Sequence, residues 1–269
     1  MAKTITGIKA GKTSIIASYS DGGVTKTASV NFTVKKIAGS SGTVSNPASQ
    51  VYKDGTQTNY SFQLGITGAT GTVTYPTSIT VKKGSTTITG WTCTNSGVLT
   101  VPYTQGAGTY TVTGNITVAE STNYNAVGAT SKSWTITINR ASFTATVSMS
   151  GYTYGGSLPS GKPSVSNNPG SGSVSYYYSK SNSNSGGTAW SNMTSTSLNA
   201  GTYYMYAVIG ETTNYKGYTT SAVQFTVSAA DFTVSGTGNQ SYVYSGSAQG
   251  TGVRASGLKG GQTATIKYG

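Results

Sequence analysis

Few side chains in this sequence could carry acid–base, nucleophilic or metal chemistry. The chain of 269 residues has no His, and its only acidic residues are Asp21, Asp54, Glu120, Glu211 and Asp231. His is the commonest general base and metal ligand, and glycoside hydrolysis needs two carboxylates close together. Glu120 and Glu211 occupy equivalent places in a repeat described below, so we expect them in different modules. The inventory predicts a protein that is not an enzyme, with no catalytic residue, no metal-binding residue and no cofactor.

Cys93 is the one cysteine, which excludes an intrachain disulfide. We expect it to be a small buried side chain. No two acids are close in sequence, so no strong calcium site is expected. A self-formed Lys–Asn isopeptide bond would need a Lys, an Asn and an acid in one core. The sequence offers a single such set, Glu120 and Asn139 with Lys82 or Lys83.

The net charge of +12 comes mainly from lysines that are spread along the chain. The only adjacent pairs are Lys35-Lys36 and Lys82-Lys83. Nucleic-acid surfaces cluster their cations and favour Arg, so we predict no nucleic-acid partner. Lys on exposed strands instead hinders edge-to-edge pairing and keeps a chain soluble. Weak attraction to anionic polymers of a cell surface is an open alternative.

The sequence offers no sign of membrane insertion, because no segment is long and apolar enough to span a bilayer. The first residues, Met1-Ala2-Lys3-Thr4, are not followed by the apolar run of a signal peptide. We therefore expect either a piece of a longer secreted protein or a protein that needs no secretion signal. A phage virion component is an example of the second kind, because lysis releases it.

The composition and the periodicity both favour strands. The chain has 20 Tyr, 5 Phe and 3 Trp, and Thr, Val, Tyr and Ile suit half-buried pleated surfaces. From residue 109 to residue 118 apolar or small residues alternate with Thr and Asn, a period of two that is typical of a half-buried antiparallel strand. Turn signals such as Asp21-Gly22-Gly23 and Asn95-Ser96-Gly97 separate such runs. The pattern predicts an all-β protein.

The clearest pattern is a repeat of about 90 residues. Ala107-Gly108-Thr109-Tyr110 recurs as Ala200-Gly201-Thr202-Tyr203. Thr122-Asn123-Tyr124 recurs as Thr213-Asn214-Tyr215, and Trp134-Thr135-Ile136 as Phe225-Thr226-Val227. Tyr154-Gly155-Gly156 recurs as Tyr244-Ser245-Gly246. A unit of this length has the size of a small β-sandwich.

The repeat divides the chain into modules. We predict complete modules at 37–139 and 140–228, a partial module with closing strands at 1–36, and a partial module with opening strands at 229–269. The joints contain no Pro or Gly run, so neighbouring modules should be stiffly coupled in a rod-like array.

These motifs resemble known families. Ile5-Thr6-Gly7-Ile8-Lys9-Ala10-Gly11-Lys12-Thr13, with the closing Ala28-Ser29-Val30-Asn31-Phe32-Thr33-Val34, is similar to the second half of a bacterial immunoglobulin-like (Ig-like) domain of the intimin/invasin kind. The later units resemble Ig-like repeats of Gram-positive and Bacteroides surface proteins and of phage structural proteins. The resemblance implies tandem Ig-like antiparallel β-sandwiches that serve as spacers, adhesins or virion decorations.

The resemblance assigns structural roles to four tyrosines. Tyr110 and Tyr203 match the tyrosine corner near the start of strand F, whose hydroxyl bonds to nearby backbone. Val112 and Met205 stand where an antibody domain has its second Cys, so packing replaces the disulfide. Tyr124 and Tyr215 should lie in the loop between strands F and G, where an aromatic more often caps the core edge than binds a ligand.

Tyr177, Tyr204 and Tyr206 form a possible binding patch. If residues 173–179 and 203–209 are strands C and F of one sheet, all three rings lie on its outer face. One interpretation is cross-strand stabilisation of a solvated sheet. The other is a platform for stacking glycans or contacting a protein, because exposed aromatic patches often mark binding sites.

The sequence thus predicts a non-catalytic structural or adhesive segment of an extracellular assembly, on a bacterial surface or a phage particle. Its expected partners are neighbouring Ig-like modules or copies of itself, with cell-surface glycans or other surface and virion proteins as further options. A carbohydrate-binding module that uses exposed tyrosines is one alternative. The half-modules at the ends indicate a piece cut from a longer array, or a head-to-tail filament completed by strand exchange between chains.

Overall fold

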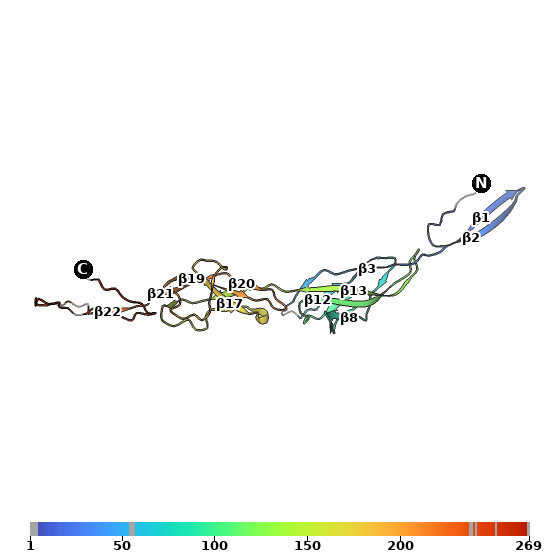
Figure 1. Ribbon diagram of the computed structural model, residues 1–269. Helices are drawn as coiled ribbons and strands as arrows, with labels where there is room; N and C mark the ends of the chain where they lie inside the picture. Colours follow the sequence, from blue (N-terminus) through green and yellow to red (C-terminus); the bar gives the residue numbers. More distant parts are fainter. Residues whose placement is uncertain (1–4, 54–56, 237–238, 240, 251, 268–269) are drawn as a thin grey trace. The chain divides into compact units, whose positions relative to one another are not determined.

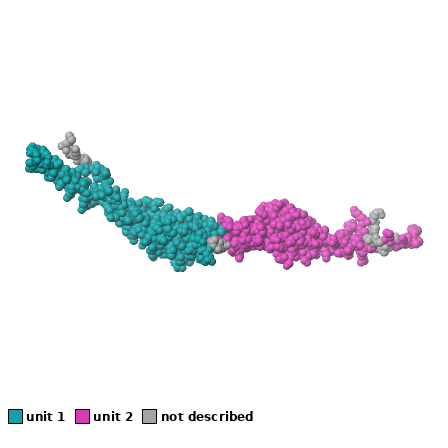
Figure 2. Space-filling model, turned by 180° about the vertical axis from the view of Figure 1, so that it is seen from behind, with its two compact units in different colours: residues 1–141 teal, residues 142–269 magenta. Residues whose placement is uncertain are grey.

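The computed structural model describes residues 5–53, 57–236, 239, 241–250 and 252–267. These residues form strands, turns and one short 3-10 helix, η1 (Pro169–Ser171), and they contain no α-helix. The expected all-β fold class is confirmed. The chain divides into two compact units, residues 1–141 and 142–269, which Figure 2 shows in different colours. Figure 1 labels strands of both units. No helix in the described part could cross a membrane.

Unit 1 contains a hairpin followed by a β-sandwich. The hairpin consists of β1 (Gly11–Asp21) and β2 (Val24–Val34), which are antiparallel along their whole length. The strands of the sandwich are β3 (Ser41–Ser45), β4 (Gln50–Val51), β5 (Tyr60–Gln63), β6 (Gly65–Ala69), β7 (Val73–Thr74), β8 (Thr80–Lys83), β9 (Thr86–Ile88), β10 (Thr92–Cys93), β11 (Val98–Val101), β12 (Gly108–Val118) and β13 (Val127–Asn139).

The core of this sandwich lies between one large sheet and two small ones. The large sheet has the order β4-β13-β12-β8-β9, with β7 also paired to β12, and the small sheets are β10-β11-β5 and β3-β6. Tyr110, Val112 and Ile116 are completely buried because alternate side chains of β12 share the inner face. Trp134 of β13 is buried among them, and its Nε1 donates to the carbonyl of Gly65 at 2.9 Å.

Unit 2 repeats this plan with fewer strands. Its sandwich consists of β14 (Thr146–Ser148), β15 (Tyr152–Thr153), β16 (Ser164–Ser166), β17 (Val174–Ser179), β18 (Thr188–Ala189), β19 (Gly201–Ile209), β20 (Tyr218–Thr219) and β21 (Val223–Ser228). The order β15-β21-β19-β17-β18, with β20 paired to β19, forms one sheet, and β14 pairs with β16. Val147, Met205 and Phe225 belong to the core between them. The unit ends with a short antiparallel pair, β22 (Thr233–Ser235) and β23 (Arg254–Ser256).

The same pair of strands occurs three times. β1, β12 and β19 each begin at a glycine, and the φ angles of Gly11, Gly108 and Gly201 are 158°, 152° and 154°, a region that favours Gly. The residues opposite these glycines are Val34, Ile138 and Val227. The pairs β1–β2, β12–β13 and β19–β21 are therefore equivalent in register. The limits of the modules themselves stay predictions.

The two end segments differ from the sandwiches in burial. No residue of β1, β2, β22 or β23 is buried, whereas each sandwich has a cluster of fully buried apolar side chains. An isolated two-stranded hairpin is marginally stable in water because it has no second layer to cover its apolar face. The conformations of the ends thus rest on fewer contacts than those of the sandwiches.

Candidate functional site

Tyr110 and Tyr203 each make the hydrogen bond that defines a tyrosine corner. Tyr110 Oη donates to the carbonyl of Gly106 at 2.6 Å, and Tyr203 Oη donates to the carbonyl of Asn199 at 3.0 Å. In both sandwiches the acceptor stands four residues before the tyrosine, at the turn that leads into the strand. This is the arrangement at the start of strand F in Ig-like sandwiches. The corner holds that turn against the core.

Tyr124 and Tyr215 lie in loops of the same local shape. The amide of Ser121 donates to the carbonyl of Tyr124, and the amide of Thr212 donates to the carbonyl of Tyr215, both at 3.0 Å. Tyr215 is buried, and its ring meets that of Phe143 edge-on with centroids 6.0 Å apart. Tyr124 is half-buried and forms a parallel bridge with Ile37.

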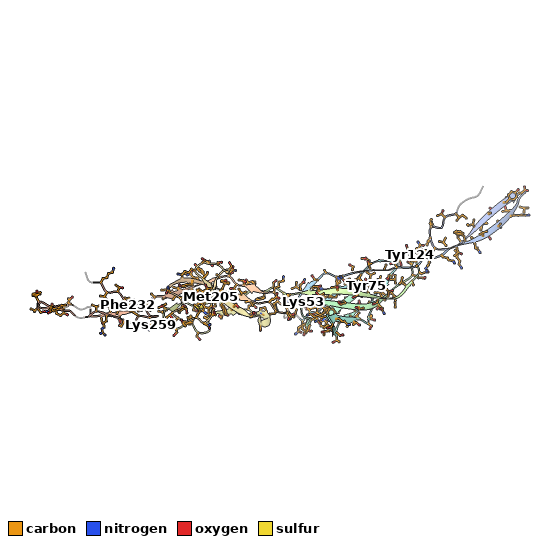
Figure 3. All side chains as sticks on the ribbon, in the orientation of Figure 1. Lys53, Tyr75, Tyr124, Met205, Phe232 and Lys259 are labelled. Atoms are coloured by element: carbon orange, nitrogen blue, oxygen red, sulfur yellow. The ribbon has the colours of Figure 1, made fainter. Side chains whose placement is uncertain are left out.

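The loop that carries Tyr124 holds the linker that leads out of the N-terminal hairpin. The amide of Ile37 donates to the carbonyl of Asn123, and the amide of Asn125 donates to the carbonyl of Ile37, both at 2.9 Å. Asn123 Oδ1 also accepts a hydrogen bond of 2.9 Å from the backbone amide of Ala10, which precedes β1. Figure 3 labels Tyr124 in this joint. The loop therefore anchors both the entry and the exit of the hairpin.

An ion pair reinforces the joint. Lys36 Nζ lies 3.0 Å from Glu120 Oε2, with 32% and 69% of the two side chains exposed. An exposed pair of this kind contributes about 0–1 kcal/mol, so the backbone bonds dominate. The sequence marked the loop through the repeated Asn-Tyr motif, but it did not reveal that Asn123, Glu120 and Lys36 meet. That contact depends on the fold of the loop.

The predicted patch of three exposed tyrosines is wrong for Tyr206. β17 and β19 do pair, with Tyr177 opposite Tyr206, but Tyr206 is only 4% exposed. The ring of Tyr177 stacks on it at 5.3 Å, and the amide of Gly187 donates to its hydroxyl at 3.0 Å. Tyr177 and Tyr204 are half-buried. The residues that lead into β18 fold back over this face, which the alternation within β19 could not reveal.

The one candidate set for an isopeptide bond is also not brought together. Lys83 Nζ donates to the carbonyl of Ala107 at 2.9 Å, and Asn139 Nδ2 donates to Ser49 Oγ at 2.9 Å, both near the start of β12. Glu120 follows the other end of β12. Because β12 is eleven residues long, Glu120 lies about 35 Å along the strand from Lys83 and Asn139. No acid of this set is therefore placed to assist the reaction.

The described residues contain no group of three or more His, Cys, Asp or Glu that could hold a metal ion. Asp54 lies outside the described residues. Cys93 is buried in the core of unit 1, and burial raises the pKa of its thiol. A buried thiol with a raised pKa is a poor nucleophile, because the thiolate is the reactive form.

Both sandwiches are Ig-like. In unit 2, β17, β19 and β21 lie in one sheet and correspond to strands C, F and G of an Ig-like sandwich. The opposite sheet contains β14 and β16, which correspond to strands A and B. No protein-family model matches the sequence, and no curated protein matches it. Among solved structures, the immunoglobulin domains 1–4 of Sidekick-1 match at 11% identity with a TM-score of 0.23. That match covers 87% of this chain and 75% of the other. Since this TM-score is low, the Ig-like assignment rests on the strand order and the two tyrosine corners.

Proposed function

We propose that this chain is a non-catalytic structural or adhesive segment of an extracellular assembly, in which Ig-like modules are connected in series. The observation that carries the proposal is the joint of unit 1. A loop of the sandwich binds the linker through the backbone of Ile37 and the hairpin through the amide of Ala10. A flexible linker would need no such contacts, whereas modules that stack in series contact their neighbours through fixed joints.

The setting that we propose is a bacterial cell surface or a phage particle. It is supported by the likeness of the sequence around β1 and β2 to bacterial Ig-like domains of the intimin/invasin kind. The repeated Gly-Thr-Tyr and Asn-Tyr motifs, which the tyrosine corners and the joint loop use, are similar to those of bacterial surface and phage structural repeats.

The structure does not favour a glycan-stacking function for the tyrosines. Such a platform needs ring faces that are open to solvent. Tyr206 is covered by Tyr177 and by the residues that lead into β18. The pair therefore resembles a cross-strand contact that stabilises the sheet.

Surface labelling tests the proposed setting. Antibodies raised against this chain should bind intact cells or intact phage particles of the source without permeabilisation. Antibodies against a cytoplasmic protein of the same source provide the matched control and should bind only after lysis. If the chain is detected only after lysis, and only in the soluble interior fraction, the proposal is contradicted.

A further inference from the structure

A groove of about 420 Å³ opens on unit 2 beside the tyrosine corner of Tyr203. It lies between the end of β17, the start of β18 and the turn that leads into β19, and its lining includes Tyr178, Lys180, Leu198 and Asn199. None of the described residues that line it is Asp or Glu, and Lys180 is the charged side chain among them. Ligand sites in proteins have a similar size, about 300–1000 Å³. The groove therefore has room for a ligand and a positive charge at its wall.

The lysine of this groove has an equivalent in unit 1. Counted across the paired strands from the two tyrosine corners, Lys180 takes the place in unit 2 that Lys83 takes in unit 1. Lys180 Nζ lies 5.4 Å from the ring centre of Tyr203. Lys83 Nζ lies 5.3 Å from that of Tyr110. Because an aromatic face attracts a cation, each ammonium group is held beside its corner.

The two lysines differ in what else their ammonium groups contact. Lys83 is half-buried, and its Nζ donates to the carbonyl of Ala107 at 2.9 Å. Lys180 is exposed, and no hydrogen bond or ion pair joins its Nζ to any residue that the structure describes. An ammonium group has three N–H donors. In unit 2 these donors are therefore accessible to a ligand, at a position that the ring of Tyr203 fixes.

The hydroxyl groups of the two corners differ in the same way. In unit 1, Tyr110 Oη accepts a hydrogen bond of 2.8 Å from Gln105 Nε2. The residue in that place in unit 2 is Leu198, whose side chain cannot donate. Tyr203 Oη therefore accepts no hydrogen bond from the described part of the chain, although it donates one. The corner of unit 1 is closed by polar side chains, whereas that of unit 2 opens into the groove.

Two further polar side chains of the groove make no hydrogen bond with another described residue. They are the exposed hydroxyl of Thr188 and the exposed side-chain amide of Asn199. Two serines of the lining are bonded to neighbours instead: Ser179 Oγ donates to the carbonyl of Ser181, and Ser197 Oγ accepts the amide of Thr194. The groove thus combines an ammonium group, a hydroxyl and an amide that the fold itself does not use.

We propose that this groove binds a uronic acid unit of an acidic polysaccharide. An ammonium group binds a carboxylate through charge-assisted hydrogen bonds, so Lys180 Nζ contacts the carboxylate of the sugar. Hydroxyl and amide groups can both donate and accept, which suits the hydroxyls of a sugar ring, so Thr188 and Asn199 contact these. Recognition depends on charge and hydrogen bonds and needs no open aromatic face. This inference names a ligand for the adhesive part of the proposed function and rests on that function.

The net charge of the chain makes specificity the point to test. At +12 the whole protein attracts any polyanion, and salt screens such attraction between exposed charges. Binding in the groove requires Lys180 in particular and depends on the hydroxyls of the sugar as well as on its charge. A charged polymer without hydroxyls, and a sugar of the same shape without charge, therefore distinguish the groove from general attraction.

Isothermal titration calorimetry with a short oligomer of galacturonic acid tests the proposal, in buffer of physiological salt. Lys180→Gln should raise the Kd about tenfold or more, because a hydrogen bond to a charged group is lost. Asn199→Ala should raise it about 2- to 10-fold, as expected for a neutral hydrogen bond. Lys216→Gln is the matched control, since Lys216 is an exposed lysine beyond the other end of β19, and it should leave the Kd unchanged. Equal urea midpoints show that the variants are folded.

Fluorescence locates the binding site on the protein. The ring of Trp190 lies 5.9 Å from that of Tyr178, which lines the groove. The galacturonic acid oligomer should therefore change the tryptophan emission of the protein. Trp190→Phe should remove that change, because the remaining tryptophans, Trp91 and Trp134, belong to unit 1.

Two comparison ligands complete the experiment. The methyl ester of the oligomer keeps the ring hydroxyls without the charge, and polyglutamate has carboxylates without a sugar ring; both should bind about tenfold or more weakly. The inference is overturned if the oligomer does not bind, if Lys180→Gln and Lys216→Gln weaken binding equally, or if polyglutamate binds as tightly as the oligomer. Surface labelling of cells or particles is unaffected by these results, so the two proposals fail separately.

Discussion

The hydroxyl of Tyr110 has two partners in the first sandwich. It donates to the carbonyl of Gly106 and accepts from Gln105 Nε2 at 2.8 Å, while its ring lies 5.1 Å from that of Trp91. Tyr203 in the second sandwich packs against Phe225 and donates to Asn199. In both cases a buried ring fixes the position of a backbone turn through one hydrogen bond.

Replacing these hydroxyls should weaken each sandwich modestly. We expect Tyr203→Phe to lower the free energy of unfolding by about 1 kcal/mol, because the ring stays packed while one hydrogen bond is lost. Tyr110→Phe should lower it by about 1–2 kcal/mol, because the hydroxyl of Tyr110 makes two hydrogen bonds. Urea unfolding followed by tryptophan fluorescence measures the change. Tyr103→Phe, at an exposed tyrosine, is the control and should have little effect. An equal loss in all three variants would show that the corners have no special role.

Burial raises the pKa of Cys93, Tyr60, Tyr152 and Tyr176. In the unfolded chain these groups lose their protons near pH 9 to 10, the ordinary values, whereas the folded chain retains them to higher pH. The folded state then binds more protons than the unfolded state, so stability falls as pH rises.

The pH dependence of stability should therefore be flat near neutrality and decline in alkali. We expect the urea midpoint to be unchanged between about pH 6 and 8 and to fall above about pH 9. Tyr60→Phe and Tyr152→Phe together should reduce the alkaline decline, since they remove two of the groups. A midpoint that rises between pH 8 and 10 would contradict this assignment.

At the scale of elements, the contact between β17 and β19 depends on how β18 returns to the sheet. β18 pairs with β17 at Tyr177 and Tyr178, and the residues before it reach back to Tyr206. The stacked rings of Tyr177 and Tyr206 thus form a second, smaller packing layer outside the sandwich core. Tyr204, two residues earlier in β19, donates from its hydroxyl to Gln224 Oε1 at 3.5 Å.

Alanine substitutions distinguish the contributions of Tyr206 and Tyr204 to stability. Tyr206→Ala should lower the free energy of unfolding of the second sandwich by about 3 kcal/mol, because it empties a buried site. Tyr204→Ala should change it by about 0.5 kcal/mol or less, as is typical of partly exposed positions. Thermal and urea unfolding provide the values. Equal small effects would mean that Tyr206 is not covered in solution.

The sequence was a good guide to strands and a weaker guide to what covers them. The period of two in β12, and the recurrence of the motif around Gly108 at Gly201, predicted the paired closing strands of each sandwich. These features could be predicted because alternation and a strand-initiating glycine depend on local backbone geometry. Tyr206 was wrongly predicted to be exposed. The alternation in β19 defines the face of the sheet on which Tyr206 lies, but it does not predict the loop that folds onto that face. The joint at Asn123 was missed for a similar reason, since Ala10 and Asn123 are far apart in sequence and meet only through the fold.

At the scale of the molecule, buried apolar side chains are unevenly distributed along the chain. Each sandwich buries aromatic and aliphatic side chains in a core of its own, whereas the ends keep theirs in contact with solvent. The central claim is that each sandwich has a buried core of its own, whereas the pairs β1–β2 and β22–β23 have none.

Amide hydrogen exchange measured by mass spectrometry tests this claim most directly. In a dilute sample that contains single chains, amides of β12, β13, β19 and β21 should exchange slowly, since they open only with their sandwich. Amides of β1, β2, β22 and β23 should exchange much faster, because no core protects them. Equal protection of β1–β2 and β12–β13 in single chains would contradict the claim.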